Sequence, residues 1–321
     1  MISATIHRKA ASHVFCSVLA LTVAMLVAMG GPTHTHATGG KQTTFTSPES
    51  AVQALIQTVR EVDKNGLLVI LGSEGKDVIE SGDEVADRWD MEQFLKAYDA
   101  AHALINNSDG SVALQIGTQE WPFPIPLVKR GGAWHFDTPS GVDEILHRRI
   151  GRNELSTIQV CLAIVDAQRE YAMQDRSGDG FRTYAENFFS DPGKRNGLYW
   201  KTQAGEELSP LGILFLKANK EGYTRKSAED SPAPYHGYYY RLMYAQGKHA
   251  PGDAFDYVVR GKMIGGFAVV AYPADYGNSG VMTFIVNHDG IVHQKDLGPG
   301  SEQNAGTMQA YDPDGSWVKV K

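Results

Sequence analysis

The chain has 321 residues and a formal net charge of −7 at pH 7, from 30 Lys and Arg against 37 Asp and Glu. An acidic balance without a cluster of basic residues argues against nucleic acid and anionic membrane surfaces as partners. This length is enough for two ordinary domains, each with its own hydrophobic core.

The N-terminal residues follow the order of a secretory signal peptide. Two adjacent basic residues precede an uncharged apolar stretch over residues 14–29, and a small-residue site ends at Ala37. The apolar stretch is shorter than the ~20 residues that cross a hydrocarbon core, so a retained membrane anchor is the less favoured alternative. We therefore expect a signal peptide over residues 1–37, with cleavage after Gly30 as an alternative. The mature protein is expected in the periplasm or the medium, without a membrane span.

Cys161 is the single cysteine that remains once the leader, which contains Cys16, is removed. One thiol cannot form an internal disulfide, and its position in an apolar helical pattern predicts a buried structural cysteine. The fold must therefore be held by packing alone. The pattern divides the chain into a linker over residues 38–44, an N-terminal domain over residues 45–141 and a C-terminal domain over residues 142–321.

The N-terminal domain begins with helical patterns and ends with strands. Ser47 and Pro48 are an N-cap and a first-turn proline for an amphipathic helix, and a second helix is expected over residues 90–105. Residues 125–128 and 133–136 flank a Lys-Arg-Gly-Gly turn, which predicts a β-hairpin. This order predicts an α+β domain with helices packed on an antiparallel sheet.

The C-terminal domain opens with one long helical pattern over residues 142–175 and ends with strands. A loop-rich middle, with a short helix over residues 211–219, is expected to cover one edge of the sheet. Four strand-like segments follow, over residues 235–245, 267–272, 281–287 and 291–295. The fold class is therefore α+β in both domains, the second being a long helix on a β-meander.

An acidic loop after the long helix has the ligand spacing of a calcium site, with a glycine where such loops turn sharply. The expected ligands are Asp175, Ser177, Asp179, the Phe181 carbonyl, Thr183 and Glu186. Serine at the third position and arginine at the eighth depart from the pattern and weaken the expected affinity. We predict a calcium site between two helical segments. A metal-free turn at the end of a helix is the alternative.

Polar residues in and between the predicted C-terminal strands suggest a second kind of site. His236 lies in an aromatic run that suits a sugar or peptide groove, and His288 and Asp289 are neighbours in a turn. Turns contain His and Asp for backbone reasons, so we favour core and rim positions for these residues. The sequence contains no nucleophile elbow, zinc helix or phosphate loop, and no catalytic residue is predicted. A cell-envelope hydrolase that uses these three residues is the alternative.

Distinctive blocks of sequence are spread over residues 45–317, among them WPFPIPLVKRGGAWHFDT, PYHGYYYRL, GKMIGGFAVVAYPADYG and GVMTFIVNHDGIVHQKDLG. They resemble a bacterial family of exported proteins named domain of unknown function 2950. That family has no assigned activity, so the resemblance implies no catalytic or binding residue.

The second half, from Asn153 onward, is also similar to the globular part of type IV pilin-like and pseudopilin proteins, in which a helix packs on an antiparallel sheet. Pilins carry a hydrophobic N-terminal helix behind a processing site, whereas the helix here is internal and amphipathic. The first half is similar to small cone-shaped domains of the nuclear-transport-factor type, which serve as ligand pockets or adaptors.

These observations together predict an exported envelope protein that is a binding or structural module and not an enzyme. Its expected partner is an envelope protein or a glycan, and calcium is the expected cofactor. A pilin-like assembly or secretion-system subunit is a further alternative to the hydrolase.

Overall fold

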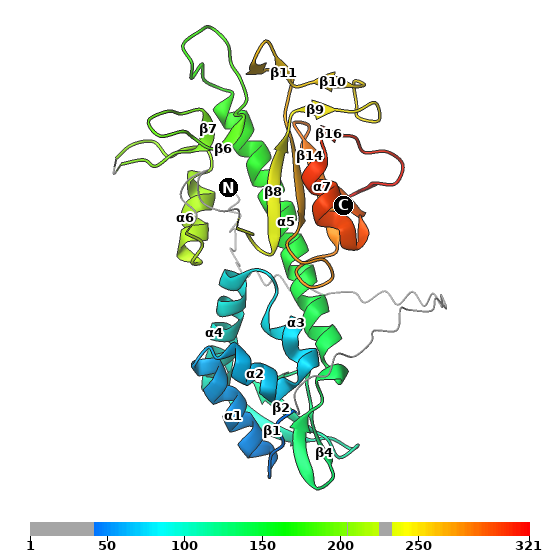
Figure 1. Cartoon of the computed structure of the whole chain (residues 1–321). Coiled ribbons are helices and arrows are strands. Elements are labelled where there is room, and N and C mark those ends of the chain that lie inside the picture. The colour runs from blue at the N-terminus through cyan, green and yellow to red at the C-terminus, as the bar shows by residue number, and fades with distance from the viewer. Residues whose placement is uncertain (1–41, 204, 225–232) are drawn as a thin grey trace, which may run out of the picture. The chain divides into compact units, whose positions relative to one another are not determined.

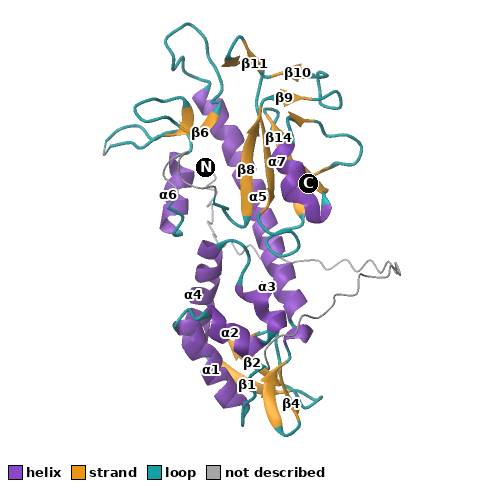
Figure 2. Cartoon of the chain, viewed as in Figure 1, coloured by secondary structure: helices purple, strands orange, loops and turns teal. Residues whose placement is uncertain are grey.

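Helices and β-sheets make up the computed structural model, which describes residues 42–203, 205–224 and 233–321 (Figure 1, Figure 2). This composition confirms the α+β fold class. The predicted signal peptide over residues 1–37 lies outside the described residues. Among the described helices, none has the length and the apolar character needed to cross a membrane.

Four helices come first along the described chain. They are α1 (Pro48–Arg60), α2 (Lys64–Leu71), α3 (Lys76–Ile79) and α4 (Glu84–Ala100). α1 begins as predicted, because Ser47 Oγ accepts a hydrogen bond from Ser50 N at 3.2 Å and a proline opens the first turn. α2 and α3 have no counterpart in the sequence prediction.

An antiparallel sheet follows, in the order β1-β2-β4-β5, with β3 paired to β2. Its strands are β1 (His102–Asn106), β2 (Val112–Ile116), β3 (Trp121–Pro122), β4 (Leu127–Arg130) and β5 (Ala133–Phe136). The β4-β5 hairpin confirms the predicted Lys-Arg-Gly-Gly turn. The helix predicted over residues 90–105 is wrong at its end. Residues 102–106 leave the helix because they pair with residues 112–116 as neighbouring strands.

A helix of 30 residues, α5 (Val142–Tyr171), confirms the long helical pattern. It packs against the strands β13 (Ala268–Pro273) and β14 (Met282–Asn287). Cys161 lies on its buried face and is 0% exposed, which confirms the prediction of a structural cysteine. Burial raises the pKa of the Cys161 thiol to about 12.

The second sheet is antiparallel, with strand order β17-β15-β14-β13-β8. Its remaining strands are β8 (Tyr238–Met243), β15 (His293–Asp296) and β17 (Val318–Lys319). The four strands β8, β13, β14 and β15 confirm the predicted meander. β8 is an edge strand of this sheet, because β13 pairs with it on one side only.

Shorter elements complete the fold. They are β6 (Asn187–Phe189), β7 (Gly197–Tyr199), α6 (Gly212–Lys220), β9 (Ala245–Gln246), β10 (Phe255–Asp256), β11 (Val258–Val259), β12 (Lys262–Met263), α7 (Ser301–Thr307) and β16 (Ala310–Tyr311), with 3-10 turns at Ser73–Gly75, Thr138–Ser140 and Gly298–Gly300. α6 confirms the predicted short helix. The helix predicted after the acidic loop is wrong, because β6 lies there and pairs in parallel with β7.

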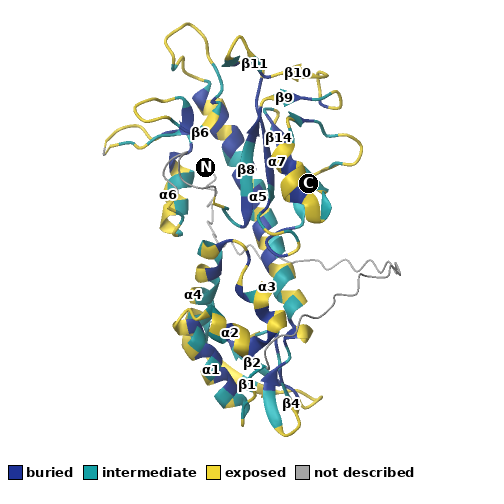
Figure 3. Ribbon diagram, in the orientation of Figure 1, coloured by how far each residue is buried: buried dark blue, intermediate teal, exposed yellow. Residues whose placement is uncertain are grey.

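The described residues belong to one compact unit with two hydrophobic cores (Figure 3). One core joins α1 and α2 to the first sheet, and the other joins α5 to the second. The predicted linker residue Gln42 is tied to the first core, since its side-chain amide donates to Ile70 O at 3.0 Å and Phe136 O at 2.8 Å. The domain boundary at residues 141–142 and the pilin-like character stay predictions.

Candidate functional site

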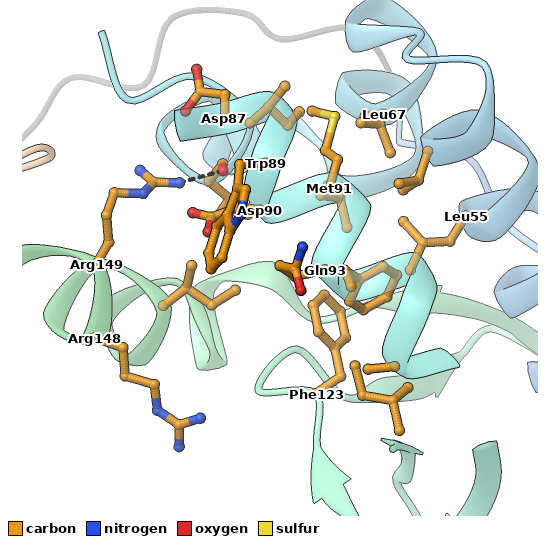
Figure 4. Close-up of a pocket in the computed structure, with 18 of the residues that line it drawn as sticks. Leu55, Leu67, Asp87, Trp89, Asp90, Met91, Gln93, Phe123, Arg148 and Arg149 are labelled. Atoms are coloured by element: carbon orange, nitrogen blue, oxygen red, sulfur yellow. Dashed lines mark hydrogen bonds between the residues drawn. The ribbon is translucent and has the colours of Figure 1, made fainter. Parts of the chain in front are cut away.

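A pocket of about 430 Å³ lies between α1, α2, α4, β2 and the start of α5 (Figure 4). Figure 4 shows Leu55, Leu67 and Met91 across the pocket from Arg148 and Arg149. This volume falls within the ~300–1,000 Å³ of small-molecule sites. The inner wall of this apolar pocket consists of Leu55, Val59, Leu67, Leu71, Val78, Ile79, Met91, Phe94, Ala97, Ile116, Phe123 and Ile145.

The inner wall follows from the local pattern of each element. On α4, Met91, Phe94 and Ala97 recur at three-residue spacing and therefore face the same side. On β2, Ile116 lies on the face that alternation buries. Phe123, which follows β3 in the chain, adds to this wall, and its ring centroid lies 5.4 Å from that of Phe94. Apolar faces from separate elements thus meet around one space.

Two tryptophan-arginine pairs flank the mouth of the apolar pocket. The guanidinium carbon of Arg148 lies 4.9 Å from the ring centroid of Trp121, and that of Arg152 lies 5.6 Å from the ring centroid of Trp89. The tryptophans are 37% and 42% exposed, which is unusual for so large an apolar side chain. Because the two arginines are four residues apart on α5, they share one face of the helix.

Both mouth arginines also form ion pairs at the surface. Arg152 makes two bonds to the carboxylate of Asp90, at 2.8 and 2.7 Å, and Arg148 Nε donates to Glu144 Oε1 at 2.6 Å. The arginine side chains are 45% and 48% exposed. The single-bond pair of Arg148 with Glu144 contributes ~0–1 kcal/mol, so a ligand carboxylate can replace Glu144 at little cost, whereas the two-bond pair of Arg152 with Asp90 is stronger.

Two buried charged groups line the pocket behind its mouth. Arg149, 6% exposed, donates to the backbone oxygens of Asp77 and Val78 at 2.6 Å and to the side-chain oxygen of Asn278. Asp87, also 6% exposed, accepts from a backbone N–H at 3.1 and 3.2 Å. Burial raises the pKa of Asp87 above its ordinary value, against the opposing hydrogen bonds and Arg149. Asp87 and the two terminal nitrogens of Arg149 are engaged by the protein and buried, whereas Arg148 and Arg152 are half-exposed.

The predicted calcium loop forms a turn in which two of the three predicted carboxylates, those of Asp175 and Asp179, already have partners. Asp175 accepts from Gly178 N and Gly180 N, both at 2.8 Å, and the Gly180 bond is the largest cause of its lowered pKa. Gly180 has a φ of 88°, so the sharp turn expected at this glycine is present. Asp179 pairs with Lys262.

The other predicted ligands have separate surroundings. Ser177 Oγ lies 3.4 Å from Asp175 Oδ1, the Phe181 ring is 53% exposed and Thr183 is half-buried. The backbone oxygen of Glu186 accepts from a tyrosine hydroxyl at 3.1 Å. Within the described ranges, no three His, Cys, Asp or Glu side chains form a metal-binding group. Calcium binding stays a prediction.

The residues considered for hydrolysis lie in different surroundings. His236 Nε2 is 3.7 Å from Glu221 Oε2, whereas the His288 ring packs against Tyr257 with 5.6 Å between centroids. His288 Nε2 lies 3.9 Å from Asp289 Oδ1, beyond hydrogen-bond distance. None of the three candidate residues lines the apolar pocket. The structure therefore does not assemble them into one site.

Sequence reasoning missed the mouth of the apolar pocket. An available signal was the spacing of Arg148 and Arg152, which places two cations on one face of a helix that was correctly predicted. Their partners Trp89 and Trp121 come from α4 and β3, and no local pattern shows that these elements meet α5. The pocket needed the tertiary structure.

Comparison with known proteins identifies a family and no activity. Residues 42–320 match the family described as "Protein of unknown function (DUF2950)". No curated protein and no solved structure matches the chain. The expected resemblance to pilin-like domains is therefore not confirmed.

Proposed function

Since the chain belongs to the DUF2950 family of proteins of unknown function, we propose from its own geometry that it is a non-catalytic binding protein. Its ligand is an amphiphile with an apolar body and an anionic end, such as a fatty acid. The observation that carries this proposal is an apolar pocket flanked by two half-exposed arginines, each stacked on an exposed tryptophan.

The interior of the pocket selects the body of the ligand. Its inner wall is aliphatic and aromatic, so a sugar or another polar body would lose hydrogen bonds to water without replacement. An apolar body instead gains ~25 cal/mol for each Å² that it removes from water. The exposed faces of Trp89 and Trp121 extend this apolar surface to the mouth.

The charge at the mouth selects the end of the ligand. Three arginines and two aspartates line the pocket, which leaves one net positive charge when all five are ionised. Arg149 and Asp87 are held by the protein, whereas Arg148 and Arg152 are half-exposed. A carboxylate or sulfonate can accept forked hydrogen bonds from these guanidinium groups. A cationic ligand would meet repulsion at the same place.

The test uses anilinonaphthalene sulfonate as a fluorescent probe and dodecanoate as its competitor. We expect the probe to bind one site and dodecanoate to displace it. Dodecanol and dodecyltrimethylammonium have the same chain without the negative charge, and both should compete less well. Equal competition by all three would contradict selection at the mouth.

Variants separate the two parts of the site. Ala97→Phe fills the interior and should abolish probe binding. The double variant Arg148→Gln and Arg152→Gln should weaken dodecanoate more than dodecanol. Arg130→Gln is the matched control, because Arg130 is an exposed arginine that pairs with Asp137 and does not line the pocket. Unchanged probe binding by the Ala97→Phe variant would rule out this pocket as the binding site.

Export is part of the same proposal and rests on the signal-peptide pattern. We propose that residues 1–37 are removed and that the protein acts in the periplasm or the medium. N-terminal sequencing of protein recovered outside the cytoplasm should begin near Thr38. Protein that retains Met1 there would contradict cleavage. Calcium is proposed as a stabiliser of the acidic loop and not as a catalytic group.

A further inference from the structure

A second groove, of about 680 Å³, lies beside the open edge of β8. Its walls come from β8, from α6, from residues 186–189 and from the start of α4 (Figure 1). We term it the tyrosine groove because its lining includes Tyr223, Tyr235, Tyr239, Tyr240, Tyr244 and Tyr272.

The hydrogen-bond phase of β8 decides which backbone groups face this groove. Gly237 O accepts from Ala274 N at 2.9 Å, and these residues continue the antiparallel register of β8 and β13. In such a ladder, alternate residues turn both backbone groups to the partner strand. Odd-numbered residues of β8 therefore face β13. Tyr240 and Leu242 turn their N–H and C=O groups to the open side.

Part of this open edge is already paired, and part is free. Tyr238 turns its backbone groups to the same open side as Tyr240 and Leu242, and it exchanges backbone hydrogen bonds with Tyr235 at 3.2 and 2.8 Å. Leu242 O accepts from Arg241 Nη1 at 3.3 Å. In the part of the chain that the structure describes, the N–H and C=O of Tyr240 and the N–H of Leu242 have no hydrogen-bond partner. The described residues of the loop-rich middle, which is expected to cover this edge, therefore leave these three groups unpaired.

Apolar rings stand on both sides of the free edge. Tyr239 and Tyr272 lie with ring centroids 5.7 Å apart, and both are half-buried. On the α6 side, the Phe215 ring stacks on Tyr199 at 4.0 Å and also lines the groove. An extended chain between these walls would place alternate side chains against them.

The charges of the lining favour a basic occupant. Three carboxylates, Asp83, Glu84 and Glu186, line the groove with one arginine, Arg241. Asp83 is occupied, because it accepts from Tyr223 Oη and a backbone N–H, both at 2.9 Å. Arg241 is also occupied, since it donates to backbone oxygens of the segment after α7 and of α7 itself. Glu84 and, in the calcium-free protein, Glu186 remain to meet a cation.

We propose that the tyrosine groove binds an extended basic peptide of a partner protein, which adds to β8 as a strand. Its backbone pairs with Tyr240 and Leu242, its apolar side chains lie between the aromatic walls, and a Lys or Arg meets Glu84 or Glu186. Unpaired edge groups are a template for such strand addition. The groove and the apolar pocket are separate sites, so this inference does not depend on the proposed amphiphile.

The first experiment selects hexapeptides from a displayed random library on the full mature chain. Enriched peptides should alternate apolar residues and carry Lys or Arg. The double variant Glu84→Lys and Glu186→Lys should bind them about tenfold more weakly. Glu92→Lys is the matched control, an exposed glutamate of α4 outside the groove, and should bind as the wild type does. Selection of the same peptides by the double variant would overturn the assignment.

The second experiment reads the backbone directly by amide hydrogen exchange with a selected peptide bound. The amides of Tyr240 and Leu242 should gain protection. Those of Tyr239 and Arg241, already bonded to β13, should change little. A peptide methylated at alternate backbone nitrogens should not bind. Binding that leaves Tyr240 and Leu242 unprotected would overturn strand addition, as would failure to select any peptide while a soluble oligosaccharide protects the groove.

Discussion

The apolar pocket and the tyrosine groove are both built where a helix layer meets an antiparallel sheet, yet they differ in their polar groups. In the apolar pocket, the polar groups that a ligand can reach lie at the mouth, on Arg148 and Arg152. In the tyrosine groove, the N–H and C=O of Tyr240 and the N–H of Leu242, which have no partner among the described residues, lie along the wall. A pocket between a helix layer and a sheet selects its ligand by shape and apolar area. An open strand edge selects an extended chain by hydrogen-bond register.

The largest expected effect concerns the buried arginine behind the mouth. Arg149→Met leaves two backbone oxygens and Asn278 without their donor, and should destabilise the fold by ~3–5 kcal/mol. Its sequence neighbour Arg148 is exposed, so Arg148→Met should cost ~0–1 kcal/mol. Urea unfolding of both variants checks this. Equal losses would contradict the distinction between the mouth and the buried network.

The next prediction compares the walls of the two sites. Leu55 is 2% exposed, so Leu55→Ala should cost ~2–5 kcal/mol through lost burial and an enlarged cavity. Tyr239 is half-buried and faces the tyrosine groove, so Tyr239→Ala should cost about 1 kcal/mol. Both values come from urea unfolding. A greater loss for Tyr239→Ala would show that the groove wall is part of a core.

Calcium should have a moderate effect away from both sites. Exported calcium modules bind at ~10⁻⁴ to 10⁻³ M, and ten times the dissociation constant stabilises a protein by about 1.4 kcal/mol. We expect calcium at millimolar concentration to raise the Tm, and magnesium to do so much less. Asp179→Ala or Glu186→Ala should remove the difference. Calorimetry that detects no calcium binding at several times this concentration would leave the loop as a turn.

The smallest expected effect is a pH dependence that comes from the apolar pocket. Burial raises the pKa of Asp87 above its ordinary value of 3.8, so the folded chain holds this proton more tightly than the unfolded chain. The resulting stability is present below pH 3.8 and is lost as pH rises through the folded pKa. As the pH rises through this range, the wild type should therefore lose stability relative to the Asp87→Asn variant. Parallel pH profiles of the two proteins in urea unfolding would contradict the shift.

Local signals in the sequence were enough to predict many of the elements. Ser47 and the proline after it specify the start of α1, and the Lys-Arg-Gly-Gly turn specifies the β4-β5 hairpin. The α5 pattern correctly placed Cys161 on a buried face. These signals are reliable because a cap, a turn or an apolar face depends on residues a few positions apart. The α+β class followed from their order.

Tertiary structure decided what depends on residues far apart in the chain. Residues 102–106 became a strand because residues 112–116 offer it a ladder, which outweighs a weak helical pattern. The apolar pocket exists because α4, β3 and α5 bring Trp89, Trp121 and the arginines together. The free edge at Tyr240 exists because β8 is the last strand of its sheet. No local pattern in the sequence predicts such contacts, because their stabilising free energy is gained only when segments distant in the chain come together.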